Sequence, residues 1–281
     1  MYAFGLHRYV ANTTFMLKEN YPGEGALVMV FQQEKALEKV IYVLWKAESE
    51  PLDSFNQTLL QQASDQLLAL GVEKLQINLV DADVAAGQHL SAGPLRPAPS
   101  AMVSFWLNAA HDRPAAEEVL ERFAPRIAGY AVAESTVLPN TRQPNTQGRV
   151  RGFSQLAFLF KLPSITREGF LQIWMRDQTR VGVETQDTFY YCQNIVTRVL
   201  TPGAPMWDGI VEECYPTEAM TDPLVFWKAN GSEEVYRANY EREMTNVARF
   251  LDLENGSVMI TSAYRLPGWA DPAPAGAADH G

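Results

Sequence analysis

The order of predicted secondary-structure elements occurs twice along this chain, and that repeat restricts the fold more than any other feature of the sequence. In each half, a short apolar strand is followed by an amphipathic helix, two more strands, a second helix and a closing strand. Trp45 and Phe55 stand ten residues apart, as Phe160 and Phe170 do, so the halves align there without a gap. Each half is therefore predicted to follow the order β-α-β-β-α-β.

Turn residues bound the predicted elements. In the first half, the strands are predicted at 39–45, 72–80, 101–107 and 130–138, and the helices at 51–70 and 113–129. In the second half, the strands are predicted at 155–160, 188–196, 207–215 and 257–264, and the helices begin near 164 and 233. The apolar stripe of the last helix is predicted to consist of Tyr236, Tyr240, Met244, Val247 and Leu251. The Gly/Pro-rich stretch 87–100 is predicted as a loop, and 139–148 as a linker.

The strands are apolar throughout, which indicates burial on both faces. Because both helices of such a unit cover one face of its sheet, the other face needs a second cover. The simplest cover is the sheet of the other half; the alternative is two independent domains on a tether. We predict an α+β fold of two tandem ferredoxin-like βαββαβ domains, whose antiparallel sheets face each other as an intramolecular α/β barrel around an apolar pocket. The predicted divisions are an N-terminal arm at 1–24, a diverged first domain at 25–140, a second domain at 150–266 and a disordered tail at 267–281.

Charge and composition exclude several classes of partner. The formal net charge of −10 argues against nucleic acid and anionic membranes. No apolar run approaches the roughly 20 residues that span a bilayer, and no signal peptide is expected. Cys192 and Cys214 are predicted to be buried free thiols, which suits the cytoplasm. The four histidines are scattered and no CxxC or HExxH motif occurs, so neither a metal nor a cofactor is expected.

Four short motifs of the second half resemble those of EthD-like proteins in the dimeric α/β-barrel superfamily. They cover about 150–266 and lie at 170–174 (FLQIW), 191–194 (YCQN), 207–212 (WDGIVE) and 248–252 (ARFLD). The first half shares the element order but almost none of these motifs. The resemblance implies a ferredoxin-like fold, barrel pairing and a pocket between sheet and helices. It also implies relatives that are cofactor-free cyclases, dehydratases or monooxygenases of aromatic or polyketide-like compounds, with haem-binding proteins in the wider superfamily.

One position departs from the family pattern. The family carries a histidine eight residues after the phenylalanine of its first helix, where this chain has Gln178 in the second half and Ala63 in the first. Glutamine exchanges hydrogen bonds but does not act as an acid or base near neutral pH. A general-base mechanism resting on that histidine therefore does not carry over. Gln178 is expected either to orient a substrate or to be a solvated or capping side chain.

Three polar side chains of the second strand are candidates for the pocket. Tyr190 and Tyr191 are adjacent and point to opposite faces, so one of them is expected to face the pocket. Asn194 shares the Tyr190 face and could form a polar patch with it. A phenol there could donate to a substrate oxygen; the alternative is core packing with a satisfied hydroxyl.

The third strand supplies the candidate carboxylates. Asp208 and Glu212 are four residues apart and are expected on one face. A buried carboxylate in an apolar barrel has a raised pKa and can serve as general acid or base. The alternatives are that Asp208 caps the strand and that Glu212 pairs with an arginine.

The remaining candidates are aromatic side chains and one histidine. Trp174, Phe158 and Phe160 are expected to line the pocket or to be plain core. His7 lies in an aromatic N-terminal arm that has no counterpart in the second half. It could replace the missing family histidine if the arm folds over the pocket.

Three functions stay open. The leading hypothesis is a cofactor-independent lyase, cyclase or dehydratase that acts on a hydrophobic aromatic small molecule by acid/base chemistry next to a carbonyl, with Glu212, Tyr190, Gln178 and Asp208 as catalytic candidates. The second is a non-catalytic binding or accessory protein, and the third is a cofactor-free or haem-dependent oxidoreductase. A homodimer of two such chains is expected because the sheets should retain exposed edge strands.

Overall fold

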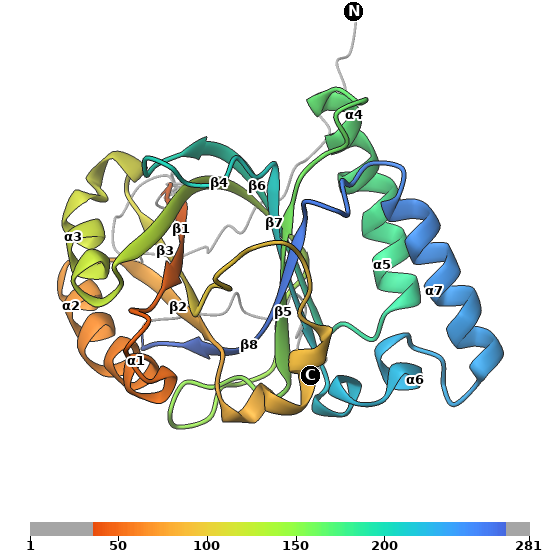
Figure 1. Ribbon diagram of the computed structural model, residues 1–281, viewed down its shortest axis with the longest axis horizontal. Coiled ribbons are helices and arrows are strands. Elements are labelled where there is room, and N and C mark those ends of the chain that lie inside the picture. Colours follow the sequence, from red (N-terminus) through yellow and green to blue (C-terminus); the bar gives the residue numbers. More distant parts are fainter. Residues whose placement is uncertain (1–35, 268–281) are drawn as a thin grey trace, which may run out of the picture. The chain divides into compact units, whose positions relative to one another are not determined.

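The computed structural model describes residues 36–267 and contains two sets of four strands with their helices (Figure 1). The strands are β1 (Glu38–Trp45), β2 (Glu73–Leu79), β3 (Ala101–Leu107), β4 (Arg126–Leu138), β5 (Phe153–Leu159), β6 (Tyr190–Val199), β7 (Gly209–Tyr215) and β8 (Ser257–Arg265). The α-helices are α1 (Leu52–Thr58), α2 (Ser64–Ala69), α3 (Pro114–Phe123), α4 (Arg167–Gln172), α5 (Thr179–Thr185), α6 (Pro223–Phe226) and α7 (Glu233–Val247). Every predicted strand is present, with its ends shifted by a few residues.

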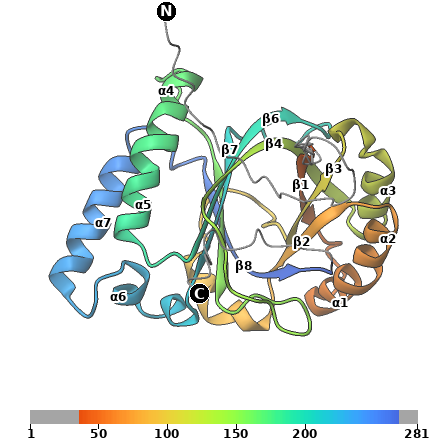
Figure 2. The ribbon, with the colours of Figure 1, turned by 180° about the vertical axis from the view of Figure 1, so that it is seen from behind.

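The eight strands form one closed barrel in the order β1-β3-β2-β8-β5-β7-β6-β4, and all neighbours are antiparallel (Figure 2). Within each half the strands lie in the spatial order fourth, first, third, second. The halves join where β2 pairs with β8 and where β4 pairs with β6. The expectation of exposed edge strands is therefore wrong for the described residues, because each strand of the ring has two neighbours.

The helices of each half cover the outer face of their own sheet (Figure 1). Alternate residues of β1 illustrate the two sides: Val40 packs with the helices of the first half, whereas Ile41 packs inside the barrel. In the second half, Phe170 and Phe250 pack against the outer face of that sheet. The strands are thus buried on both faces, as their apolar sequences predicted.

Two predicted elements need correction. The helix predicted at 113–129 ends at Phe123, and β4 begins at Arg126. Pro125 explains the early end, because a proline pushes the preceding residue out of the helical region, and Ala124 is extended at φ −134° and ψ 119°. Part of the loop predicted at 87–100 belongs to a 3₁₀ segment, η2 (Ala82–Leu90). Asp81 caps the start of this segment, because its side chain accepts a hydrogen bond from the Asp83 N–H.

The first helix of each half contains a π-helical turn at the same place. These turns are η1 (Leu59–Ala63) between α1 and α2, and η4 (Ile173–Gln178) between α4 and α5. Gln178, at the end of η4, is buried, whereas Asp177 is exposed and pairs with Arg249. Such turns often occur near functional sites.

Helix α7 buries polar residues beside the predicted apolar stripe, of which Met244, Val247 and Leu251 pack in the core of the second half. Tyr240 is 46% exposed, while Glu243 and Asn246 are almost fully buried against the second half. The prediction that Tyr240 lies on the buried face is therefore wrong. The predicted N-terminal arm, with His7, lies outside the described residues, as does nearly all of the predicted tail.

Candidate functional site

The barrel interior is apolar towards one end. Trp207 stacks on Phe158 at a ring-centroid distance of 4.3 Å and on Tyr130 at 5.0 Å. Trp45 and Met259 pack in the same group, and Phe160 is half-buried against it. Phe158 and Phe160 were expected to line a pocket or to be plain core; both belong to this aromatic packing, and Phe158 also lines a cavity at this end of the barrel.

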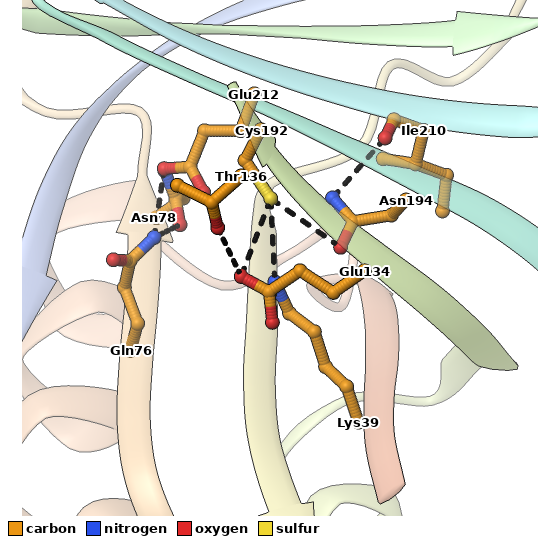
Figure 3. Close-up of polar contacts among 9 residues, drawn as sticks. All are labelled: Lys39, Gln76, Asn78, Glu134, Thr136, Cys192, Asn194, Ile210 and Glu212. Atoms are coloured by element: carbon orange, nitrogen blue, oxygen red, sulfur yellow. Dashed lines mark hydrogen bonds and ion pairs between the residues drawn. The ribbon is translucent and has the colours of Figure 1, made fainter. Parts of the chain in front are cut away.

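Glu212 lies at the centre of a polar network further along the barrel (Figure 3). Its Oε1 accepts hydrogen bonds from Gln76 Nε2 at 2.7 Å, Asn78 Nδ2 at 3.0 Å and Ser154 Oγ at 3.1 Å. Glu212 is 2% exposed. Amides and a hydroxyl, rather than the arginine considered from sequence, therefore hold this carboxylate.

Lys39 lies beside this network and is also buried (Figure 3). Its Nζ is 3.6 Å from Glu134 Oε2 and 3.9 Å from Cys192 Sγ. Burial alone lowers the pKa of Lys39, but the acidic groups around it, Cys192, Glu134 and Glu212, outweigh burial and raise that pKa above its ordinary value. Lys39 is thus a buried cation. We call Lys39, Gln76, Asn78, Glu134, Cys192 and Glu212 the interior cluster.

Cys192 is not an activated nucleophile in this cluster. Burial raises the pKa of its thiol to about 12, and Lys39 offsets this only in part. At neutral pH the group is therefore a thiol that contacts Glu134 Oε1 at 3.4 Å, and covalent chemistry needs a thiolate. Cys192 and Cys214 are both buried and free, as predicted.

Tyr190 and Asn194 lie on the interior side of β6 with Cys192 between them. Asn194 Nδ2 donates to the Ile210 carbonyl at 3.1 Å, and Asn194 Oδ1 is 3.8 Å from Cys192 Sγ. Burial raises the pKa of Tyr190 well above its ordinary value. The structure thus brings Tyr190, Asn194 and Glu212 to the barrel interior together.

Gln178 lies on the other side of the second sheet, between α5 and α7. Its Nε2 donates to Glu243 Oε1, and its Oε1 accepts from Asn246 Nδ2 at 2.6 Å. Thr185 Oγ1 donates to the second oxygen of Glu243 at 3.2 Å. Gln178 is therefore neither solvated nor a helix cap; it fixes a buried carboxyl group.

Glu213 faces this same region from β7. A Cβ added at Gly182 of α5 would lie 3.9 Å from Glu213 Oε1 and 3.6 Å from Gln178 Nε2, so both side chains converge on one spot. Neither Glu213 nor Glu243 forms an ion pair within residues 36–267. We call Gln178, Thr185, Glu213, Glu243 and Asn246 the helix–sheet cluster.

The two carboxyl groups of the helix–sheet cluster bind protons more tightly than usual. Burial, followed by the nearby Glu243, raises the pKa of Glu213 to about 8. Burial also raises the pKa of Glu243, against the hydrogen bonds from Gln178 and Thr185. A carboxyl group that titrates near neutral pH can act as an acid or as a base.

The other predicted site residues lie apart from the interior cluster. Tyr191 and Trp174 pack between the second sheet and its helices, on the side of the helix–sheet cluster. Asp208 precedes β7, where its Oδ2 accepts from the Lys161 N–H at 2.9 Å and its Oδ1 lies 3.6 Å from Arg167. Asp208 thus tethers the start of β7 and is not brought to Glu212.

Sequence reasoning missed Glu213, Glu243 and the buried cation Lys39. Glu213 could have been found from the sequence. It follows Glu212 directly in a strand, and adjacent strand residues face opposite sides of the sheet, so one of the two was bound to face the helices. Within the described part of the chain, no three His, Cys, Asp or Glu side chains are grouped so that they could hold a metal ion. No helix there is long and apolar enough to cross a lipid bilayer.

Among known proteins, the chain is similar only to solved structures. No family model and no curated protein matches the chain. Similar structures include an anthrone oxidase-like protein, at 9% identity, 83% of this chain, 92% of that chain and a TM-score of 0.47. Another is chlorite dismutase from Candidatus Nitrospira defluvii in complex with imidazole, at 9% identity, with the same two coverages and a TM-score of 0.42. Scores and identities this low carry no inference about function.

Proposed function

We propose that the chain is a cofactor-independent enzyme that moves a proton next to a carbonyl group of an apolar small molecule. The observation that carries this proposal is the pair Glu213 and Glu243, two carboxyl groups on facing elements that are buried together and form no ion pair with a described residue. Burying an uncompensated carboxylate is costly, so such a pair holds at least one proton. Proton transfer next to a carbonyl needs one base and one hydrogen-bond donor.

Glu213 is the proposed proton-transferring group, in place of the Glu212 expected from sequence. Glu212 is fixed by three hydrogen-bond donors inside the barrel, which favours a structural role. Gln178 is proposed as a positioning residue that fixes Glu243, and Glu243 in turn keeps the pKa of Glu213 high. Tyr191, whose hydroxyl lies 2.9 Å from Gln193 Nε2, is proposed as a donor on the same side of the sheet.

The test compares two neighbouring substitutions, Glu213→Gln and Glu212→Gln. Exchange of α-protons in D₂O, followed by ¹H NMR over a panel of aryl ketones and β-diketones, reports the proposed step without any cofactor. We expect the natural chain to accelerate exchange and Glu213→Gln to lose this by about 100-fold or more, the usual contribution of general acid–base catalysis. Folded Glu212→Gln protein should catalyse the exchange at the same rate as the natural chain.

A third substitution checks the assignment by pH. Glu243→Gln removes the like charge near Glu213, so the pKa of Glu213 should fall and the pH profile of exchange should move to lower pH. Full activity in folded Glu213→Gln, or loss confined to folded Glu212→Gln, would contradict the role of Glu213. No exchange by the natural chain across the panel would reject carbonyl proton transfer.

The second candidate function is a non-catalytic binding or accessory protein. It is favoured by the barrel interior, where aromatic packing and the interior cluster occupy the positions expected to line a pocket. Replacement of the family histidine by Gln178 favours it as well. A chain that binds apolar ligands yet gives no exchange with any carbonyl compound would support this candidate.

We also propose that the halves 25–140 and 150–266 arose by tandem duplication of an EthD-like unit. The same strand order and the π-helical turn in the first helix of each half support this. A reducing cytoplasm suits the two free thiols. The proposed homodimer would have to use helical or loop surfaces, because the barrel of the described residues is closed.

A further inference from the structure

A cavity of about 410 Å³ opens at the apolar end of the barrel, and we call it the mouth cavity. Both halves line it. Phe158 and Met259 supply apolar walls from β5 and β8, Val80 supplies another just after β2, and the segment 91–100 passes along its side. The volume lies within the usual range of small-molecule sites, roughly 300–1,000 Å³, which are mostly apolar with a few polar groups.

The charged residues that line the mouth cavity are both cations, Lys46 and Arg96, with no carboxylate among the lining residues. Lys46 Nζ donates to the Ala47 carbonyl at 3.1 Å. Arg96 Nη1 donates to the carbonyls of Gly93 and Leu95, at 2.9 and 2.8 Å. Neither cation forms an ion pair with a described residue. Two uncompensated cations on a chain with a net charge of −10 make this a local site for an anion.

Ser257 lies beside the two cations in the lining of the cavity and opposite Phe158 in the β5–β8 ladder. It is 7% exposed, and its buried Oγ faces Gly93, where an added Cβ would meet it. The 91–100 segment therefore covers this hydroxyl group, and the anion is left to Lys46 and Arg96.

We propose that the mouth cavity binds an apolar molecule that carries one anionic head group, a carboxylate or sulfonate. The apolar body would lie against Phe158 and Met259, and Lys46 and Arg96 would attract the head group. This site shares no residue with the helix–sheet cluster. The proposal therefore stands whether or not the chain is an enzyme.

The test uses two fluorescent probes with the same aromatic body. 8-Anilinonaphthalene-1-sulfonate carries the anionic group, and N-phenyl-1-naphthylamine lacks it. Fluorescence titration of the natural chain should give tighter binding of the sulfonate. The double substitution Lys46→Gln with Arg96→Gln should weaken sulfonate binding by about tenfold or more and leave the neutral probe within about twofold. Arg237→Gln, on the exposed side of α7, is the matched control and should change neither.

One further substitution locates the site. Ala98→Trp, in the exposed segment beside the cavity, should block both probes. The proposal is overturned if the double substitution leaves sulfonate affinity unchanged, if it weakens both probes equally, or if Ala98→Trp blocks neither.

Discussion

Glu212 and Glu213 are consecutive residues of β7, yet their carboxyl groups lie on opposite sides of the sheet. Glu212 accepts hydrogen bonds from Gln76, Asn78 and Ser154 inside the barrel. Glu213 faces the helices, where burial and Glu243 raise its pKa to about 8. One strand thus supplies a fixed carboxylate to one compartment and a carboxyl group that titrates near neutral pH to the other.

Stability should fall as the pH rises towards 8. Glu213 has an ordinary pKa of 4.5 when unfolded and about 8 when folded, so between these values the folded state binds more protons than the unfolded state. The free energy of unfolding therefore decreases with rising pH across this window, by an amount on the order of 5 kcal/mol. Glu243, whose pKa is also raised, acts in the same direction.

Urea denaturation between pH 5 and pH 8.5 measures this slope. Glu213→Gln should flatten it, whereas Glu118→Gln, an exposed glutamate of α3, should leave it as it is in the natural chain. A slope that Glu213→Gln does not change would contradict the assignment of the raised pKa.

Lys39 should couple energetically to Glu134. Lys39→Met leaves Glu134 and Glu212 without their buried cation and should cost about 2–4 kcal/mol of unfolding free energy. Adding Glu134→Gln removes one of the carboxylates left unpaired, so the double variant should lose less than the sum of the two single variants. A double-mutant cycle by urea denaturation measures the difference. Additive losses would mean that the 3.6 Å pair contributes nothing to stability.

Gly209 and Trp174 should also be coupled. A Cβ added at Gly209 would lie 2.6 Å from Cζ3 of the buried Trp174 ring, so Gly209→Ala should cost about 1–3 kcal/mol through overpacking. In a Trp174→Phe background the smaller ring leaves room, and the same change should cost clearly less. Thermal melts of the four chains give the comparison. An equal cost in both backgrounds would contradict this close approach.

Both cysteines should be unreactive in the folded chain. Burial raises the pKa of Cys192 to about 12 and that of Cys214 well above its ordinary value. At pH 8, a thiol-reactive disulfide reagent should modify neither residue in native buffer and both in guanidinium. Rapid native modification of Cys192 would show that Lys39 activates it as a thiolate.

The sequence predicted much of the fold because apolar runs and turn residues are local signals. The strand at 101–107 follows from its continuous apolar run, and the placement of Tyr190 and Asn194 on one face follows from strand alternation. Alternation also separates Glu212 from Glu213. It does not tell which face becomes the barrel interior, since that depends on the side on which the helices pack.

The helix–sheet cluster was harder to predict for two physical reasons. Helical periodicity places Gln178 on the buried face between Trp174 and Val181, but its partners Glu243 and Asn246 belong to α7, more than sixty residues further along the chain. Helix α7 buries Glu243 and Asn246, which lie beside the apolar stripe that hydrophobic periodicity predicts and are not part of it. Both side chains become interpretable only when the elements that satisfy them are seen together.

The seam between β2 and β8 bears on how the chain is made. It joins residues 76–79 to residues 262–265, so the ring closes only with a strand that leaves the ribosome after the other seven strands of the described residues. Until then, one edge of β2 has no strand to pair with, and its backbone hydrogen-bonding groups are exposed. Newly made chains are therefore most exposed to mispairing just before β8 emerges, and substitutions in β8 should reduce the yield of folded protein more than equivalent ones in β1.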